Sequence, residues 1–311
     1  MKKNQMNRRA FMKYQMWGAL WAASGMSGLF MPKTGIAGVT PEIALVKGRP
    51  GAATRAAVEV LGGMKQFVKP GNRVVIKPNM SFATPPERAS NTHPEVVREL
   101  AAMCKEAGAG KVLILDHTLG QPENCLNNSG IRDAAKSIED KMVYALNDDS
   151  FYRKVKIPEG KSMTQVEVMK EVLKSDVLIA APVAKSHSST GVSLSMKGMM
   201  GLVYNRGIMH WRYDLHTSIV DLCTIVKPDL ALIDGTRVLS TNGPNGPGKV
   251  LHKKTIIASR DMVAADAYAV SLFEWYGKRF KPRQVAHIRE AHDRGLGRMD
   301  VENFNVRSIA L

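Results

Sequence analysis

Residues 91–116 read NTHPEVVRELAAMCKEAGAGKVLILD, and this stretch decides the fold class. Its first part has the pattern of an amphipathic helix, in which Thr92 is the predicted N-cap, Pro94 falls in the first turn and Gly108 ends the segment. Apolar side chains recur there at helical spacing, at Val96, Val97, Leu100 and Met103. Residues 111–115 then form an apolar run without alternation, which is typical of a strand buried on both faces of a parallel sheet.

The same alternation of short apolar strands and single helices continues along the chain. The predicted strands cover residues 43–46, 73–76, 111–115, 142–146, 176–181, 230–233 and 255–258. Further predicted helices cover residues 54–61, 131–138, 166–173, 215–226, 262–276 and 282–291. Because strands separated by single helices pair in parallel, the sequence predicts a three-layer α/β fold with a mostly parallel sheet and helices on both faces. We expect one domain over residues 38–311, or two closely packed lobes of about residues 38–160 and 161–311.

The first 37 residues have the composition of an export signal. The sequence NRRAFMK, which begins at Asn7, is followed by an apolar stretch over residues 14–31 and by small residues at 35–37. Adjacent arginines followed by Phe and Lys are typical of the twin-arginine pathway. We expect residues 1–37 to be a twin-arginine signal peptide, with the translocase as a transient partner and the mature protein in the periplasm. The alternative is a segment that is retained as an uncleaved membrane anchor.

The charge of the chain favours an anionic partner. The formal net charge is +16, and the first 37 residues hold six Lys and Arg residues and no acidic residue, so the remainder carries +10. A basic balance of this kind attracts anions. Nucleic acid is a poor partner outside the inner membrane, and we therefore expect a small acidic ligand or substrate and no nucleic acid.

The three cysteines, Cys104, Cys125 and Cys223, do not form a metal-binding pattern. None belongs to a Cys-x-x-Cys pair, and three thiolates cannot supply the four ligands of a structural zinc or iron–sulfur site. We therefore expect no intrinsic iron–sulfur cluster, and the sequence identifies no other cofactor. One disulfide with one thiol left over stays open for an exported protein.

Polar side chains follow five of the predicted strands. These strand exits are Lys77-Pro78-Asn79, Asp116-His117-Thr118, Lys185-Ser186-His187, Asp234-Gly235-Thr236 and Ser259-Arg260-Asp261. Ligands of open α/β sheets bind beyond the carboxyl ends of the strands. We therefore expect the five exits to meet at one edge of the sheet and to form a binding site there.

The segment 182–201, PVAKSHSSTGVSLSMKGMMG, has the composition of an anion-binding loop. It combines hydroxyl side chains with Lys185, His187 and Lys197, and such groups donate hydrogen bonds to anionic oxygens. A helix that begins near Ser193 or Ser195 would aim its amide groups at the same place.

An ordered set of short motifs resembles one known family. The motifs are Lys77-Pro78-Asn79, Lys185-x-His187, Ser195-x-Lys197-Gly198-x-x-Gly201, His210, Asp234-Gly235, Asn242-Gly243-Pro244 and the pair Asp261 and Asp266. Over about residues 43–280 the chain resembles the uncharacterised family catalogued as "domain of unknown function 362". Members are often linked to iron–sulfur proteins, and some carry a ferredoxin-like segment that this chain lacks. The resemblance implies an α/β fold and a candidate site, but no reaction.

Under the first functional hypothesis the protein binds a small acidic molecule, and whether it is an enzyme stays open. The candidate catalytic residues are Lys185, His187, Lys197 and Asp234. The candidate binding residues are Lys77, Asn79, Asp116, Ser195, Gly201 and His210. In this hypothesis the cationic groups hold carboxylate or phosphate oxygens, and Asp234 and Asp116 act as acid–base or histidine-orienting groups.

Two alternative hypotheses remain. The protein is an accessory or electron-transfer partner of a periplasmic iron–sulfur or other redox enzyme, in which case the redox centre belongs to that partner. Or it binds a metal ion through oxygen and imidazole ligands, with Asp261 and Asp266 as candidates beside Asp234 and His210. Asp261 is also placed to cap the helix predicted from residue 262.

Overall fold

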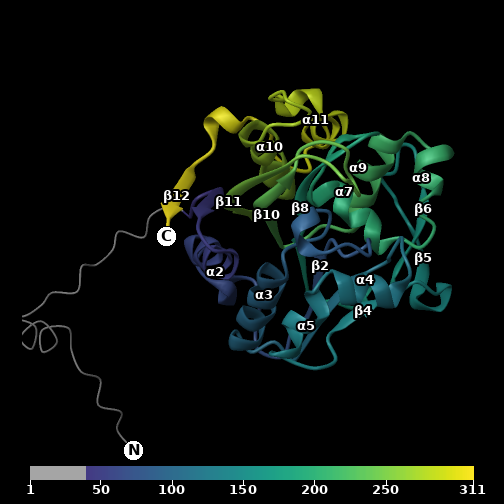
Figure 1. Ribbon diagram of the computed structural model, residues 1–311. Coiled ribbons are helices and arrows are strands. Elements are labelled where there is room, and N and C mark those ends of the chain that lie inside the picture. The colour runs from purple at the N-terminus through teal and green to yellow at the C-terminus, as the bar shows by residue number, and fades with distance from the viewer. Residues whose placement is uncertain (1–39) are drawn as a thin grey trace, which may run out of the picture. The chain divides into compact units, whose positions relative to one another are not determined.

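A ten-stranded sheet forms the centre of residues 40–311, the part of the chain that this computed structural model describes (Figure 1). The main path through the sheet is β12 (Val306–Ala310), β1 (Ile43–Lys47), β11 (Val250–Ser259), β10 (Leu230–Leu239), β7 (Val177–Ala181), β2 (Arg73–Pro78), β3 (Lys111–Asp116) and β4 (Val143–Ala145). Within residues 40–311, β11 is antiparallel to both neighbours, and the other strands of this path share one direction. The sheet is therefore mostly parallel, as predicted.

Helices cover both faces of the sheet (Figure 1). One face packs against α2 (Pro50–Val60), α3 (Pro94–Glu106) and α5 (Ile131–Lys136). The other packs against α7 (Ser195–Gly198), α9 (Leu215–Ile225), α10 (Met262–Leu272) and α11 (Ala286–Asp293). Consecutive strand residues point to opposite faces, so Val74 and Ile76 belong to one apolar core and Val75 to the other. The predicted three-layer α/β fold is confirmed.

Shorter elements complete the described part of the chain. The short helices are α4 (Pro122–Asn128), α6 (Lys170–Leu173) and α8 (Ile208–Trp211). Turns of 3-10 helix cover Met64–Gln66, Pro86–Arg88, Asp149–Phe151, Met199–Leu202, Pro282–Gln284 and Val301–Asn303. Beyond Pro182, the strand β8 (Val183–His187) pairs with β10, and β9 (Gly191–Ser193) folds back on β8. These two strands extend the same sheet beyond the end of β7, and the segment 182–201 runs through them into α7.

The predicted helix over residues 166–173 is wrong. Residues Gln165–Met169 form strand β6, which pairs antiparallel with β5 (Tyr152–Lys156), and only the single turn α6 follows. Val166 and Val168 are buried while Gln165 is exposed, so the side chains follow the two-residue period of a strand. A run this short fits either period, and pairing with β5 decides between them.

The prediction that five strand exits share one edge is also wrong for one of them. Because β11 runs antiparallel to β10, Ser259-Arg260-Asp261 emerges at the opposite edge of the sheet from the exits of β2, β3 and β7. The strands β10 and β11 are long and joined by the turn of residues 240–249, which makes them a hairpin rather than a crossover.

The start of α3 differs by one residue from the prediction. His93, not Thr92, is the N-cap, and its side chain accepts a hydrogen bond from the amide of Glu95. The hydroxyl of Thr92 instead donates to the carbonyl oxygen of Ala181 at 2.7 Å and accepts from the amide of Asn79 at 2.9 Å. Thr92 thereby links the carboxyl ends of β2 and β7, where the polar residues of interest begin.

Residues 40–311 form one compact unit, and strands from both halves of the chain lie in the same sheet. Cys104, Cys125 and Cys223 are buried free thiols, so the disulfide left open by the sequence is not formed.

In this part of the chain, no helix has the length and apolar character needed to cross a membrane. The predicted signal peptide of residues 1–37 lies outside the described residues.

Candidate functional site

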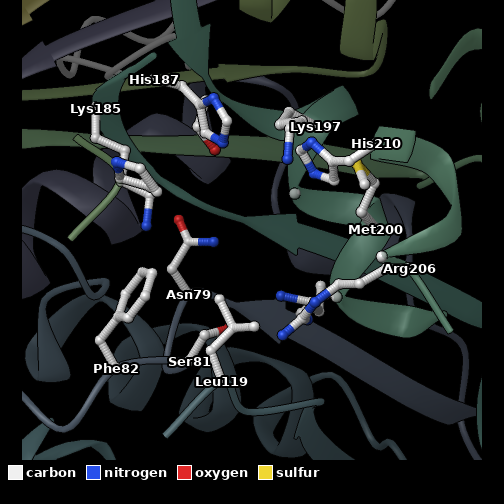
Figure 2. A pocket seen from close by; sticks show the side chains of 16 residues that line it. Asn79, Ser81, Phe82, Leu119, Lys185, His187, Lys197, Met200, Arg206 and His210 are labelled. Carbon is white, nitrogen blue, oxygen red and sulfur yellow. The ribbon is translucent and has the colours of Figure 1, made fainter. Parts of the chain in front are cut away.

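A cavity of about 220 Å³ opens at the carboxyl edge of the parallel strands (Figure 2). Its walls come from the residues after β2, from β8 and β9, from α7 and from the loop that leads into α8. Its polar side chains are those of Lys77, Asn79, Ser81, Lys185, His187, Ser193, Lys197, Arg206 and His210. Its apolar side chains are those of Phe82, Leu119, Met200 and Pro244. The cavity therefore brings together the exits of β2 and β7, while of the residues that follow β3 only Leu119 lines it.

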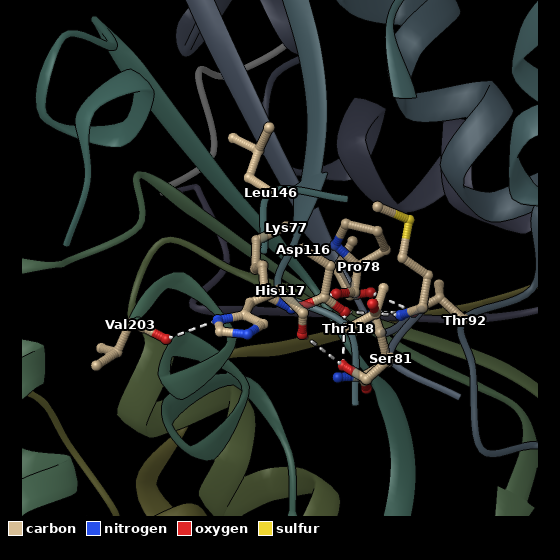
Figure 3. A network of polar contacts seen from close by, with 12 residues as sticks. Lys77, Pro78, Ser81, Thr92, Asp116, His117, Thr118, Leu146 and Val203 are labelled. Carbon is tan, nitrogen blue, oxygen red and sulfur yellow. Dashed lines mark hydrogen bonds and ion pairs between the residues drawn. The ribbon is translucent and has the colours of Figure 1, made fainter. Parts of the chain in front are cut away.

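A buried ion pair forms the floor of this cavity (Figure 3). The ammonium of Lys77 lies 3.1 Å from Oδ1 of Asp116, and it also donates to the carbonyl oxygen of Pro78. Oδ2 of Asp116 accepts hydrogen bonds from the amide of Met80 and the hydroxyl of Ser81, both at 2.9 Å. Burial lowers the pKa of Lys77, and the nearby Asp116 opposes this effect. The pair fixes the two strand exits relative to each other.

The ion pair leaves no room for a side chain at residue 201, which is a glycine. A Cβ atom at this position would lie 2.5 Å from Oδ1 of Asp116 and 2.5 Å from Cε of Lys77. The backbone of residue 201 can therefore approach the pair only without a side chain. Gly201, a candidate binding residue, lines the cavity, where its backbone approaches the ion pair closely.

Asn79 presents hydrogen-bond donors to the cavity. Its Oδ1 accepts from the amide of Val183 at 3.0 Å, so its carbonyl side faces β8. The amide nitrogen of the same side chain points into the cavity (Figure 2). Because the acceptor is already used, Asn79 offers N–H groups to a ligand.

Lys185 enters the cavity from β8. Its ammonium donates to the carbonyl oxygen of Ser90 at 2.6 Å and lies 5.1 Å from the centre of the Phe82 ring. The side chain is buried, and this burial, opposed by Asp116 and helped by the cations Lys77 and Lys197, lowers the pKa of Lys185 to about 7. A lysine of this kind exchanges its proton near neutral pH.

Lys197 and Arg206 approach from the other side. Lys197 stands on α7, whose first amides, those of Ser195 and Met196, donate to the carboxylate of Asp266. Within residues 40–311 the ammonium of Lys197 has no hydrogen-bond or ion-pair partner, and burial together with Arg206 lowers its pKa to about 8. Arg206 donates through one nitrogen to the carbonyl oxygen of His117 at 2.9 Å, while its Nη2 is buried without a partner in the described structure.

Two histidines complete the wall, with ring centres 6.3 Å apart and nearly parallel planes. Nδ1 of His187 accepts a hydrogen bond from the amide of Ser189 at 3.1 Å. In the neutral ring the proton is therefore on Nε2, which makes this nitrogen a donor. Burial, helped by Lys197 and Lys185, lowers the pKa of His187 to about 3, so the ring is neutral at physiological pH. Burial also lowers the pKa of His210.

The charged side chains that line the cavity are all basic. Lysine, arginine and histidine side chains line the cavity, and no carboxylate of residues 40–311 does so. Asp116 lies beneath the surface and is already bound to Lys77. The cavity therefore offers many donors and little negative charge, which suits a ligand rich in acceptor oxygens.

Asp234 does not reach this cavity, contrary to the prediction. Its Oδ2 accepts from the amide of His93 at 2.8 Å and lies 3.3 Å from a guanidinium nitrogen of Arg237. Its Oδ1 accepts from the amide and hydroxyl of Thr236. The carboxylate thus anchors the start of α3 to β10. The strand β10 continues to Leu239, so Asp234 lies inside the strand and not at its exit, where the sequence had placed it.

The proposed metal ligands serve as helix caps. Asp261 accepts from the amides of Val263 and Ala264 at the start of α10, and Asp266 holds the first amides of α7. Burial raises the pKa of Asp266 to about 7. No three His, Cys, Asp or Glu residues of the described chain are grouped to hold a metal ion, so the predicted set does not converge. Ser195 contributes its amide to this cap, and its side chain is outside the cavity lining.

Nine lining residues were not among the candidate catalytic or binding residues: Ser81, Phe82, Leu119, Ser193, Gly198, Met200, Arg206, Gly207 and Pro244. Arg206 is the most consequential of them because it adds a cation. It lies between the predicted residues Lys197 and His210, in a stretch without a predicted element, and a basic residue in such a loop is the signal that could have indicated it.

The fold and this cavity define an α/β protein with a cation-lined pocket at the strand carboxyl ends. The chain belongs to the family described as "domain of unknown function (DUF362)", which matches residues 74–271. A thylakoid-associated protein of Synechocystis is 28% identical over 228 residues, which are 69% of this chain and 67% of that protein.

Two solved structures share part of the architecture. The lactate racemase apoprotein from Thermoanaerobacterium thermosaccharolyticum is 13% identical, with a TM-score of 0.46 over 73% of this chain and 57% of that one. A protein from Thermotoga maritima is 14% identical, with a TM-score of 0.46 over 72% of this chain and 59% of that one. This chain therefore spans less than two thirds of either structure.

Proposed function

We propose that the protein binds a small organic anion in the strand-end cavity. The observation that carries the proposal is the lining itself, in which lysine, arginine and histidine side chains surround one space that no carboxylate of the described residues faces. Cations that are partly withdrawn from water and lack counter-ions gain free energy when an anion binds between them. Lys197 and Arg206 are the primary anchors, because their nitrogen atoms have the fewest protein partners.

The position of Lys185 supports a further step, proton transfer on the bound anion. With its pKa lowered to about 7, Lys185 is present as a free amine in part at neutral pH and can act as a general base. A C–H bond next to a carboxylate or carbonyl would break, the proton would go to Nζ of Lys185, and the electron pair would move to the oxygen. Lys197 and the Nε2–H group of His187, which line the same cavity, would stabilise that oxygen by donating hydrogen bonds.

Replacing Lys197 by methionine tests the binding site. The variant keeps most of the length of the side chain and removes the ammonium. We therefore expect affinity for organic anions to fall about tenfold to a hundredfold, the usual contribution of a charge-assisted hydrogen bond. Calorimetric titration of the purified protein with small carboxylates gives the measurement. Lys111→Met is the matched control, because Lys111 is exposed at the start of β3, at the other end of the strands.

Native mass spectrometry of the protein purified from its own cells adds an independent readout. A bound anion that is lost in the Lys197→Met variant supports the proposal. An empty protein that responds to no organic anion and copurifies with a redox enzyme would instead favour the accessory role, in which these lysines have no ligand.

We also propose export through the twin-arginine pathway, on the basis of Arg8 and Arg9 and the apolar stretch behind them. Replacing both arginines by lysine preserves the charge but removes the recognised pair, so we expect the protein to remain in the cytoplasm. Cell fractionation and the mass of the periplasmic form give the measurement, with Lys33→Arg as the control. Unchanged periplasmic amounts of the double variant would contradict this route.

A further inference from the structure

The positive charges of the cavity form two separate groups. Lys185 and the Phe82 ring lie on one side, and Lys197 and Arg206 lie on the other (Figure 2). His210 stands beside Lys197 and Arg206, but burial lowers its pKa, so it carries no positive charge at neutral pH. Asn79 and His187 stand between the two sides. Lys77 does not belong to either group, because Asp116 compensates its charge.

Neither group forms an ion pair in the described structure, although the more distant carboxylate of Asp116 attracts both Lys185 and Arg206. The ammonium of Lys185 is bound by the carbonyl oxygen of Ser90 and faces an aromatic ring, and both of these are uncharged. On the opposite side Arg206 is bound by the carbonyl oxygen of His117, and the salt bridges of residues 40–311 include neither Arg206 nor Lys197. An anion bound at one side would leave the cation of the other side without a charged group in direct contact.

The middle of the cavity is polar but uncharged. The amide nitrogen of Asn79 and Nε2 of His187 are both donors there, since their acceptor atoms are already bound by Val183 and Ser189. A ligand that reaches from one side to the other would therefore find donors along its length. A hydroxyl or carbonyl oxygen between two terminal anionic groups satisfies this arrangement.

We propose that the ligand of this cavity is a short dicarboxylate, with one carboxylate bound by Lys185 and the other by Lys197 and Arg206. The inference rests on the proposed function, since it assumes that an organic anion binds in this cavity. It adds the class of ligand and an orientation in which the two ends of the molecule meet different cations. In this complex Lys185 is protonated, so the proton transfer to Lys185 applies only to a monoanion held by Lys197 and Arg206.

The test compares matched ligands that differ in one charge. Malonate, succinate and glutarate are titrated calorimetrically into the full-length protein at neutral pH, each beside its monoamide. The monoamide has the same shape but a single carboxylate. We expect at least one dicarboxylate to bind about ten to a hundred times more tightly than its monoamide, because the second carboxylate forms a charge-assisted hydrogen bond.

Removal of one cation should abolish the difference in affinity between a dicarboxylate and its monoamide. In Lys185→Met, the dicarboxylate loses about tenfold to a hundredfold in affinity, whereas the monoamide, held by the other side, loses less than about threefold. Lys111→Met should change neither ligand. If Lys185→Met does not fold, as judged by circular dichroism, Arg206→Met makes the same comparison from the opposite side, on a loop rather than on a strand of the sheet.

The possible results separate the two proposals. Equal affinity for dicarboxylates and monoamides would overturn the two-anion ligand and leave the anion-binding function standing. A dicarboxylate preference that both variants retain would also overturn it, since the cations named would then not hold the two ends. Absence of binding by every dicarboxylate and every monoamide would overturn both the ligand class and the function.

Discussion

Replacing Asp116 by asparagine should lower the melting temperature of the protein by about 6–20 °C. The carboxylate and the Lys77 side chain are both buried, and loss of one partner of a buried pair costs about 3–5 kcal/mol because it leaves the other without compensation. In a domain of this size, each kcal/mol corresponds to a shift of about 2–4 °C. Asparagine keeps an oxygen for the amide of Met80, but it replaces Oδ1 by an N–H donor that faces the Lys77 ammonium. Differential scanning calorimetry gives the measurement.

The Lys77→Met/Asp116→Asn double variant is the control for this experiment. It removes the cation together with its partner, so we expect it to be less destabilised than the sum of the two single variants. An Asp116→Asn protein that melts at the wild-type temperature would show that Lys77 is not held charged by Asp116 in the folded protein.

Affinity for a dicarboxylate should fall at least tenfold between pH 7 and pH 9. A carboxylate is ionised throughout this range, and it binds the protonated forms of the cavity lysines. The pKa of Lys185 is about 7 and that of Lys197 is about 8, so both ammonium groups lose their protons there. Binding should therefore be accompanied by proton uptake, which calorimetry in buffers of different ionisation enthalpy measures directly.

The stability of the free protein should change with pH in the opposite direction. Each of these lysines has a lower pKa in the folded protein than in the unfolded chain, where it is about 10.4. Above pH 7 the unfolded chain thus binds more protons, and the free energy of unfolding rises with pH until the unfolded lysines also titrate. In a Lys185→Met/Lys197→Met variant, both the dicarboxylate affinity and the free energy of unfolding should depend less on pH. An affinity that is constant from pH 7 to pH 9 would contradict the assignment of these lysines as the anion's partners.

The parts of the fold that the sequence predicted are those with strong local periodicity. The buried strands around residues 73–76, 111–115 and 176–181 and the helix that begins near residue 94 lie where they were expected. The errors fall where local pattern was ambiguous. Residues 166–173 fit both the helical and the strand period. The long turn before β11 gave no local sign that β10 and β11 form a hairpin, in which β11 runs in the opposite direction.

The candidate site residues were likewise predicted correctly in some places and wrongly in others. Lys77, Asn79, Lys185, His187, Lys197, Gly201 and His210 all line the cavity, because they follow strands that are parallel and adjacent in the sheet or belong to the segment next to them. Asp116 lies directly beneath. Asp234, Asp261 and Asp266 were predicted from residue type and position near strand ends, but each carboxylate is occupied by backbone amides of a helix start.

The sequence by itself determined the α/β class, the family and the edge of the sheet where polar groups gather, since these depend on periodicity and on residues close in the chain. Only the tertiary structure decided which charges are compensated. Lys77 and Asp116, which are 39 residues apart, neutralise each other, whereas Lys185, Lys197 and Arg206 do not meet a carboxylate within the described residues. The charge of a site depends on distances between side chains from different elements, and those distances are set by how the helices and strands pack rather than by any local pattern.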